Sequence, residues 1–334
     1  MITADLVVSG QTAPRPLSDS LPFVGGIVLD SGIDRTATIL SRQDFEQAIS
    51  PITVSSSSPV ALRVAAYLAG RVPMKLIFTS GSVIPADTSH IEDTDYIVCL
   101  GVGTAYLDQL AGIAVGHQGK KQQIPILTPS PMHKPFTSIS ITNPHSMVIA
   151  GWMMDESLGW QQFIPMSAVL VERFILDYPN IAPMMSYKFP VVPVDVLYTS
   201  TESAQLAANR INHLHKTGLG EGSIYYRIIP SVSMALLSDS LSRDHILHIA
   251  VIARNILNAF ARSYLGFSMN PSLRNKIREE VVDALKTRFM YSSFKPVGYD
   301  VGVEGSLFGT DAVIRLTLKV PAAVKIINIT LEAR

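Results

Sequence analysis

The part of the sequence that looks most like a chemical site is a pair of glycines between a predicted buried strand and a predicted helix, Gly101 and Gly103. A strand, a glycine-rich turn and a helix form the phosphate-binding corner of dinucleotide-binding folds. The third glycine is missing, since Tyr106 stands there, and Lys120-Lys121 replaces the expected acidic residue. We therefore predict only a tight turn, and keep a nucleotide-binding α/β enzyme as the alternative.

Two histidine pairs have spacings at which both rings could reach one metal ion. His213 and His215 lie at the predicted end of a helix, where the dipole favours histidine, and His245 and His248 lie one turn apart. Neither pair has the glutamate of the zinc-protease arrangement. Cys99, the single cysteine, lies in an apolar run and provides no disulfide framework. We predict no metal site and no cofactor.

The remaining acidic groupings do not form a recognisable catalytic set. Asp93 with Asp95, and Asp155 with Glu156, lie in predicted loops, where solvated charge is the ordinary role of such residues. The sequence also lacks a serine-hydrolase elbow and a phosphate-binding loop with its lysine. We predict a structural protein rather than an enzyme.

Composition points to assembly. Of the 334 residues, 47% are hydrophobic and 16% charged, and Lys+Arg and Asp+Glu number 27 each. Such a balanced charge gives no overall attraction to nucleic acid or anionic lipid. It also protects poorly against self-association, which predicts that apolar surface is buried against other subunits. No secretory signal or membrane span is predicted, so we expect synthesis in a reducing cytoplasm.

Hydrophobic periodicity predicts a mixed α/β (α+β) fold. Strands and helices alternate up to residue 127, which favours a partly parallel sheet. Predicted strands occupy 23–29, 36–40, 74–78, 96–100 and 124–127, and predicted helices occupy 59–68 and 105–115, with a further helix capped by Ser41. Proline and methionine are frequent in the stretch that follows, which predicts a β-rich insertion around a helix at 167–176.

The last third of the chain has the clearest periodicity. A helix is predicted at 202–215, a strongly amphipathic helix at 243–264, and a third helix up to Phe289 that is started by Asn270-Pro271. Predicted strands follow at 294–303, 312–320 and 326–331. The predicted division is an extended arm at 1–20, a core at 21–127, the insertion at 128–200, a C-terminal domain at 201–322 and a C-terminal strand arm at 323–334.

The order of these last elements resembles the C-terminal domain of contractile tail sheath proteins, found in phage tails and phage-tail-like injection systems. The similar residues lie within 250–334 and include Asn270-Pro271-Ser272, Lys295-Pro296-Val297-Gly298 and the strands on either side of Pro321. A second similarity joins Phe23–Val28 to Thr38–Phe45. The sheath's usual Gly-Pro after the first strand is absent, because Asp30-Ser31-Gly32 stands there.

The resemblance implies a structural subunit that polymerises around an inner tube and contracts to drive that tube through a cell envelope. Sheath subunits exchange terminal strands with their neighbours, and main-chain ladders supply the affinity. The residues expected to form the exchanged strands here are Leu6, Val7, Val8, Ile326, Ile327, Ile329 and Leu331.

The resemblance also implies that the helix ending at Phe289 meets the tube, through Arg274, Lys276 and Arg278. The expected partners are copies of the chain itself, the inner tail tube protein, and baseplate and tail terminator proteins. Nucleic acid and membrane insertion are not expected. The expected location is a virion tail or tail-like particle assembled in the bacterial host cytoplasm. Another tail or capsid component is the second alternative.

Overall fold

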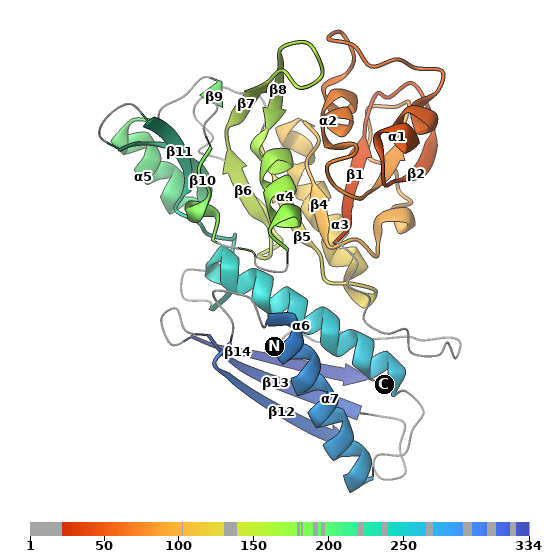
Figure 1. The fold of residues 1–334 in the computed structure, drawn as a ribbon, viewed down its shortest axis with the longest axis vertical. Coiled ribbons are helices and arrows are strands. Elements are labelled where there is room, and N and C mark those ends of the chain that lie inside the picture. The colour runs from red at the N-terminus through yellow and green to blue at the C-terminus, as the bar shows by residue number, and fades with distance from the viewer. Residues whose placement is uncertain are drawn as a thin grey trace.

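The chain folds into two units joined by one long helix (Figure 1). This computed structural model describes residues 22–101, 103–129, 139–178, 181, 183–189, 193–194, 198–219, 223–235, 240–264, 270–289, 296–305, 312–320 and 325–333. The larger unit extends to Ile229 and beyond, and the smaller unit contains the last two helices and the last three strands.

An eight-stranded sheet forms the centre of the larger unit, in the order β11-β10-β6-β5-β4-β1-β3-β2. Its interior pairs are parallel, whereas β2 and β11 are antiparallel edge strands. The strands are β1 Val24–Val28, β2 Arg35–Ile39, β3 Met74–Phe78, β4 Tyr96–Val98, β5 Ile124–Leu127, β6 Met147–Ala150, β10 Ile211–Leu219 and β11 Ser223–Ile229.

Helices pack on both faces of this sheet, because its strands alternate apolar side chains between two cores. Val24 and Val28 of β1 belong to the core beneath α1, α2 and α4, while Ile27 belongs to the core beneath α3 and α5. The helices are α1 Arg42–Ile49, α2 Val60–Leu68, α3 Leu107–Gly116, α4 Met166–Leu176 and α5 Ser200–Ala208. Single 3-10 turns occur at η1 Ser89–Ile91, η2 Thr104–Tyr106, η3 His117–Gly119, η4 Met184–Ser186 and η5 Ser240–Ser242.

A second, three-stranded sheet lies in the larger unit in the order β8-β7-β9. Its strands are β7 Trp152–Asp155, β8 Gln162–Pro165 and β9 Pro193–Val194. It is the only part of the predicted 128–200 insertion that forms its own sheet among the described residues. β6 joins the large sheet, and so do β10 and β11, which follow residue 200. The predicted boundaries at 127/128 and 200/201 therefore fall inside one continuous sheet.

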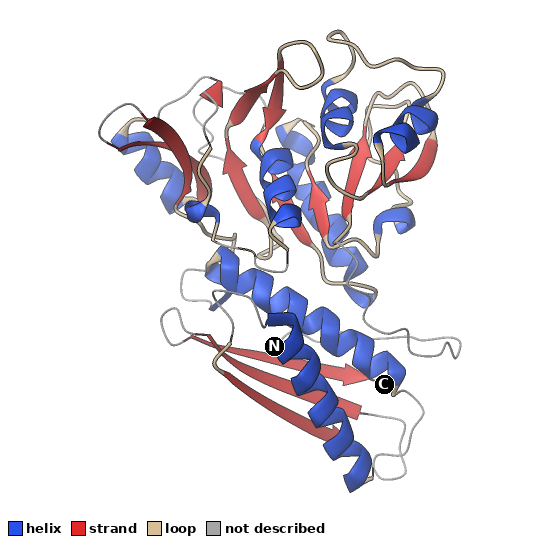
Figure 2. Ribbon diagram, in the orientation of Figure 1, coloured by secondary structure: helices blue, strands red, loops and turns tan. Residues whose placement is uncertain are grey.

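The smaller unit is a three-stranded antiparallel sheet, β12-β13-β14, packed under two helices. Figure 2 shows α7 crossing over this sheet. Ile277, Val281, Leu285 and Phe289 of α7 are buried against inward-facing residues of β12 and β13, as their four-residue spacing predicted. The elements are α6 Asp244–Ser263, α7 Pro271–Phe289, β12 Gly298–Gly305, β13 Ala312–Val320 and β14 Lys325–Ala333.

Helix α6 belongs to both units, since it has two apolar faces. Leu247 and Val251 lie in the core of the larger unit, whereas Ile246, Ala253 and Leu257 lie in the core of the smaller one. Residues three and four apart share a helix face, so these two sets point to opposite neighbours. The amphipathic helix predicted at 243–264 is confirmed, and it connects the units as well as packing in one of them.

Two predicted helix starts are confirmed. Ser41 and Asp44 form a capping box on α1, and Asn270 Oδ1 accepts a hydrogen bond from Leu273 N at 2.8 Å. The predicted helix at 202–215 is wrong beyond Ala208, because Arg210 adopts a left-handed conformation with φ 58° and the chain then enters β10. The His213 pair therefore lies in a strand and not at a helix end.

Candidate assembly surfaces

The C-terminal strand β14 pairs with β13 of the same chain. Nine residue pairs form the ladder, with Leu316 opposite Ile329 and Leu318 opposite Ile327. Leu316 and Leu318 face the buried side of the sheet. In the same register Ile327 is opposite Leu318, Leu331 is opposite Ile314, and Ile326 is opposite Lys319. The residues predicted for C-terminal strand exchange thus belong to a strand that is already paired within its own chain.

The other predicted exchange strand, Leu6-Val7-Val8, lies outside the described residues. What the structure describes is the segment that follows it. Phe23 N donates to Asp95 Oδ2 at 2.9 Å, and Asp95 N donates back to Phe23 O at 2.8 Å. This reciprocal pair fixes the point at which the N-terminal segment enters β1.

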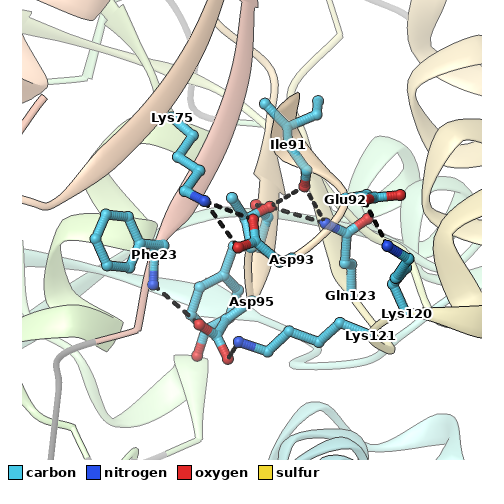
Figure 3. Close-up of polar contacts among 11 residues, drawn as sticks. Phe23, Lys75, Ile91, Glu92, Asp93, Asp95, Lys120, Lys121 and Gln123 are labelled. Atoms are coloured by element: carbon cyan, nitrogen blue, oxygen red, sulfur yellow. Dashed lines mark hydrogen bonds and ion pairs between the residues drawn. The ribbon is translucent and has the colours of Figure 1, made fainter. Parts of the chain in front are cut away.

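Three lysine–carboxylate pairs surround this entry point (Figure 3). Lys121 lies 2.8 Å from Asp95, Lys75 2.7 Å from Asp93, and Lys120 3.0 Å from Glu92. Loop position alone did not predict these partners, because the lysine of each pair comes from another segment of the chain. Partly exposed pairs of this kind contribute at most about 1 kcal/mol each, so they position the segment more than they stabilise the fold.

Beneath these charges lies a buried polar network centred on Gln123. Its Nε2 donates to Ile91 O at 2.7 Å and to Thr94 Oγ1 at 2.8 Å, and its Oε1 lies 2.9 Å from His117 Nδ1. The carbonyl and both amide hydrogens of Gln123 therefore have partners, which is what a fully buried amide requires. The arrangement is structural: it ties η1, η3 and the start of β5 together.

The three residues of α7 that are predicted to face the tube differ in their exposure and in their contacts. Lys276 is exposed and lies 3.8 Å from Glu280. Arg278 Nε donates to the main-chain oxygen of Val301 in β12 at 2.8 Å. Arg274 is half-buried. Of the three, Lys276 is the most available to another protein.

The turn at Gly101 is tight, as predicted, and its surroundings are filled. Gly101 has φ +94°, and a Cβ there would lie 2.5 Å from Val60 Cγ1 and 3.4 Å from Trp152 Cη2. Gly103 has φ −62°, an ordinary conformation for any residue, so the turn requires the conformational freedom of glycine at Gly101 and not at Gly103. The close packing favours a structural turn over the alternative of a nucleotide site at this position.

One histidine of each predicted pair, His213 and His248, is a core residue. His213 is buried against the Tyr198 ring at 5.3 Å, and burial lowers the pKa of its imidazole to about 4. His248 packs edge-on against the Phe174 ring, with centroids 4.5 Å apart. Among the described residues no group of three or more His, Cys, Asp or Glu side chains is arranged to hold a metal ion. No helix in the described ranges has the length and apolar character needed to span a membrane.

Comparison with known proteins identifies the fold through structure and not through sequence. No protein-family model matches the chain, and no curated protein matches it. Solved structures do match it. The chain superposes on the contracted helical sheath of the anti-feeding prophage with a TM-score of 0.61 and 13% identity, over 98% of this chain and 94% of that one. It has the contractile sheath fold.

Two further sheath structures agree. The PVC sheath, from an extracellular contractile injection system in its contracted state, gives a TM-score of 0.64 at 13% identity, covering 97% of this chain and 92% of that one. A sheath tail protein from Desulfitobacterium hafniense gives 0.65 at 10% identity, covering 98% and 100%. These coverages include both units, so the predicted sheath-type α/β fold is confirmed well beyond the C-terminal region that suggested it.

Proposed function

We propose that this chain is the structural subunit of a contractile sheath. Copies of it polymerise into stacked rings around an inner tube, and contraction of the polymer drives the tube through a target cell envelope. The observation that carries the proposal is the match of the whole chain, including both units and α6 between them, to sheath subunits. A low charge content and a hydrophobic fraction of 47% fit a protein that buries surface against its own copies.

Strand exchange is the proposed means of connecting subunits. β13 and β14 have a ladder in which main-chain groups carry the pairing, and such a ladder is the same whether β14 comes from its own chain or from a neighbour. The N-terminal segment, fixed at Phe23 by Asp95, is the proposed second connection. Links of this kind would persist while the subunits rotate as rigid bodies during contraction.

The proposed partners are further copies of the chain, an inner tube protein, and baseplate and terminator proteins at the two ends of the sheath. The proposed location is a virion tail or tail-like particle assembled in a bacterial host. On the tube side we propose α7, with the exposed Lys276 as the main contact, supported by Arg274 and Arg278. Exposed ion pairs suit a contact that must hold before contraction and release during it. Each pair is weak and so can break, while the pairs of many copies together hold the sheath on the tube.

Removal of residues 1–20 tests the proposed connection between subunits through the N-terminal segment. The full chain is expected to sediment as polymer as its concentration is raised, whereas the shortened chain should stay in the supernatant with an unchanged thermal unfolding transition. Equal sedimentation of both proteins would contradict the proposed role of the N-terminal segment. A full chain that never sediments would contradict the proposed function itself.

A further inference from the structure

The C-terminal strand occupies, within its own chain, the position that a neighbour's strand would need. Nine residue pairs join β14 to β13, and only residues 321–324 separate the two strands in sequence. A connection this short makes the intrachain ladder local, and so gives β14 a high effective concentration at its own β13. A neighbour's strand must compete with it for the same main-chain groups.

Packing against a helix also stabilises the intrachain position of β14. Helix α6 packs against β14 and β13, and its Ile246, Ala253 and Leu257 form one core with Ile314 and Leu316. Withdrawal of β14 would therefore expose one side of β13 and uncover part of α6. Exposure of apolar surface opposes opening, so the closed arrangement resists exchange until another strand replaces β14.

The opposite side of the sheet does not offer an equivalent opening. β12 is its outermost strand there, and α7 packs against it. Arg278 of α7 donates to the carbonyl of Val301, so one main-chain acceptor of β12 is already occupied by a side chain. β14 is the other edge strand of this sheet, and a neighbour's β14 can take its place only on β13.

We infer that β14 is a self-capping strand: in the free subunit it closes its own β13 and holds the chain in an assembly-inactive form, and polymerisation requires its release. This inference rests on the proposed function and adds its regulation. Five residue steps link Val320 to Lys325, which span at most about 18 Å when extended. A released β14 can therefore reach only a subunit already in contact, so that release and docking are coupled.

A reversible crosslink between β13 and β14 tests the inference. Thr317 and Asn328 are directly paired, so Thr317→Cys with Asn328→Cys can form an intrachain disulfide that holds β14 closed. Cys99 is fully buried and does not compete. A non-reducing gel that shows monomer mobility verifies that the bond lies within one chain. The matched control, Asp300→Cys with Thr317→Cys, crosslinks β12 to β13 and leaves β14 free.

The expected result is loss of tubes, by electron microscopy and sedimentation, from the oxidised β13–β14 variant, and their recovery after reduction. The control variant should form tubes in both states. Tubes formed equally by the oxidised and reduced β13–β14 variant would overturn the inference and leave the proposed function intact. If neither the reduced variant nor the unaltered chain forms tubes under any condition, the proposed function fails and the inference fails with it.

Discussion

Asn255 of α6 and Gln122, 133 positions apart in the chain, bind each other through two hydrogen bonds. Gln122 N donates to Asn255 Oδ1 at 3.0 Å, and Asn255 Nδ2 donates to Gln122 O at 3.2 Å. The side-chain amide of Asn255 thus satisfies both main-chain groups of Gln122, just before β5 begins. This pair anchors the helix shared by the two units to the N-terminal end of β5, an interior strand of the large sheet.

Replacement of that amide should weaken the junction between the units. We expect Asn255→Ala to lower the free energy of unfolding by about 1–3 kcal/mol, because two main-chain groups lose their partners at a partly buried site. Urea unfolding followed by circular dichroism measures the change. An unaltered midpoint and slope would show that the junction does not depend on this pair.

Asn258, one turn further along α6, provides the matched control. It is 3% exposed, and within the part of the chain that the structure describes neither its Oδ1 nor its Nδ2 has a hydrogen-bond partner. Burying an unpaired amide is unfavourable, so Asn258→Leu should leave stability unchanged or raise it. A loss as large as that of Asn255→Ala would mean that the amide of Asn258 is used in the folded chain.

The two glycines after β4 should respond differently to the same change. Gly101→Ala must place a Cβ 2.5 Å from Val60 Cγ1 on a backbone with φ +94°, so we expect a loss of about 2 kcal/mol or more. Gly103→Ala meets no atom nearer than Tyr106 Cδ2 at 3.9 Å and should change stability little. Thermal unfolding of both variants checks this, and equal losses would contradict the geometry. Micromolar binding of a dinucleotide to the unaltered chain would revive the enzyme alternative.

Stability should fall in mild acid because of His213. Burial lowers the pKa of its imidazole to about 4 in the folded chain, against about 6.5 when unfolded. Between these pH values the unfolded chain binds a proton that the folded chain does not, so the free energy of unfolding decreases as pH falls from about 6.5 to 4. The full decrease is about 3 kcal/mol. His213→Leu should remove this slope, whereas His215→Leu, at an exposed position, should keep it. An unchanged slope in His213→Leu would contradict the assignment.

The tube-side proposal is best tested at Lys276. Lys276→Glu is expected to prevent assembly of extended sheath around its tube while contracted polymers still form, since repulsion at each exposed contact adds over many copies. Changing all of Arg274, Lys276 and Arg278 to Glu should have a larger effect, but also removes the bond from Arg278 to Val301. Lys286→Glu, with the same charge change elsewhere on α7, is the control. Normal extended sheath with Lys276→Glu would exclude this residue from the tube contact.

Local sequence signals predicted local structure well. The capping box of Ser41 and Asp44, the Asn270-Pro271 helix start and the strand Met74–Phe78 depend on neighbours in sequence, and all three are present. Helix 202–215 was predicted too long, because its second half is recruited as a strand beside β6, a pairing that no local pattern reveals.

The candidate sites depend even more on distant pairing. The partners of Asp93 and Asp95 come from Lys75 and Lys121, 18 or more positions away, so loop position alone suggested unpaired charge. The apolar alternation of 326–331 predicted a strand correctly, but alternation cannot tell whether that strand pairs within its chain or with another. In the structure β14 pairs with β13 of its own chain.

Electron microscopy of the purified full-length chain, concentrated and incubated, tests the central claim most directly. The sheath account predicts hollow tubes with helical symmetry, built from subunits whose C-terminal unit lines the inner wall. Particles that stay single 36.3 kDa subunits at every concentration and incubation time would contradict it.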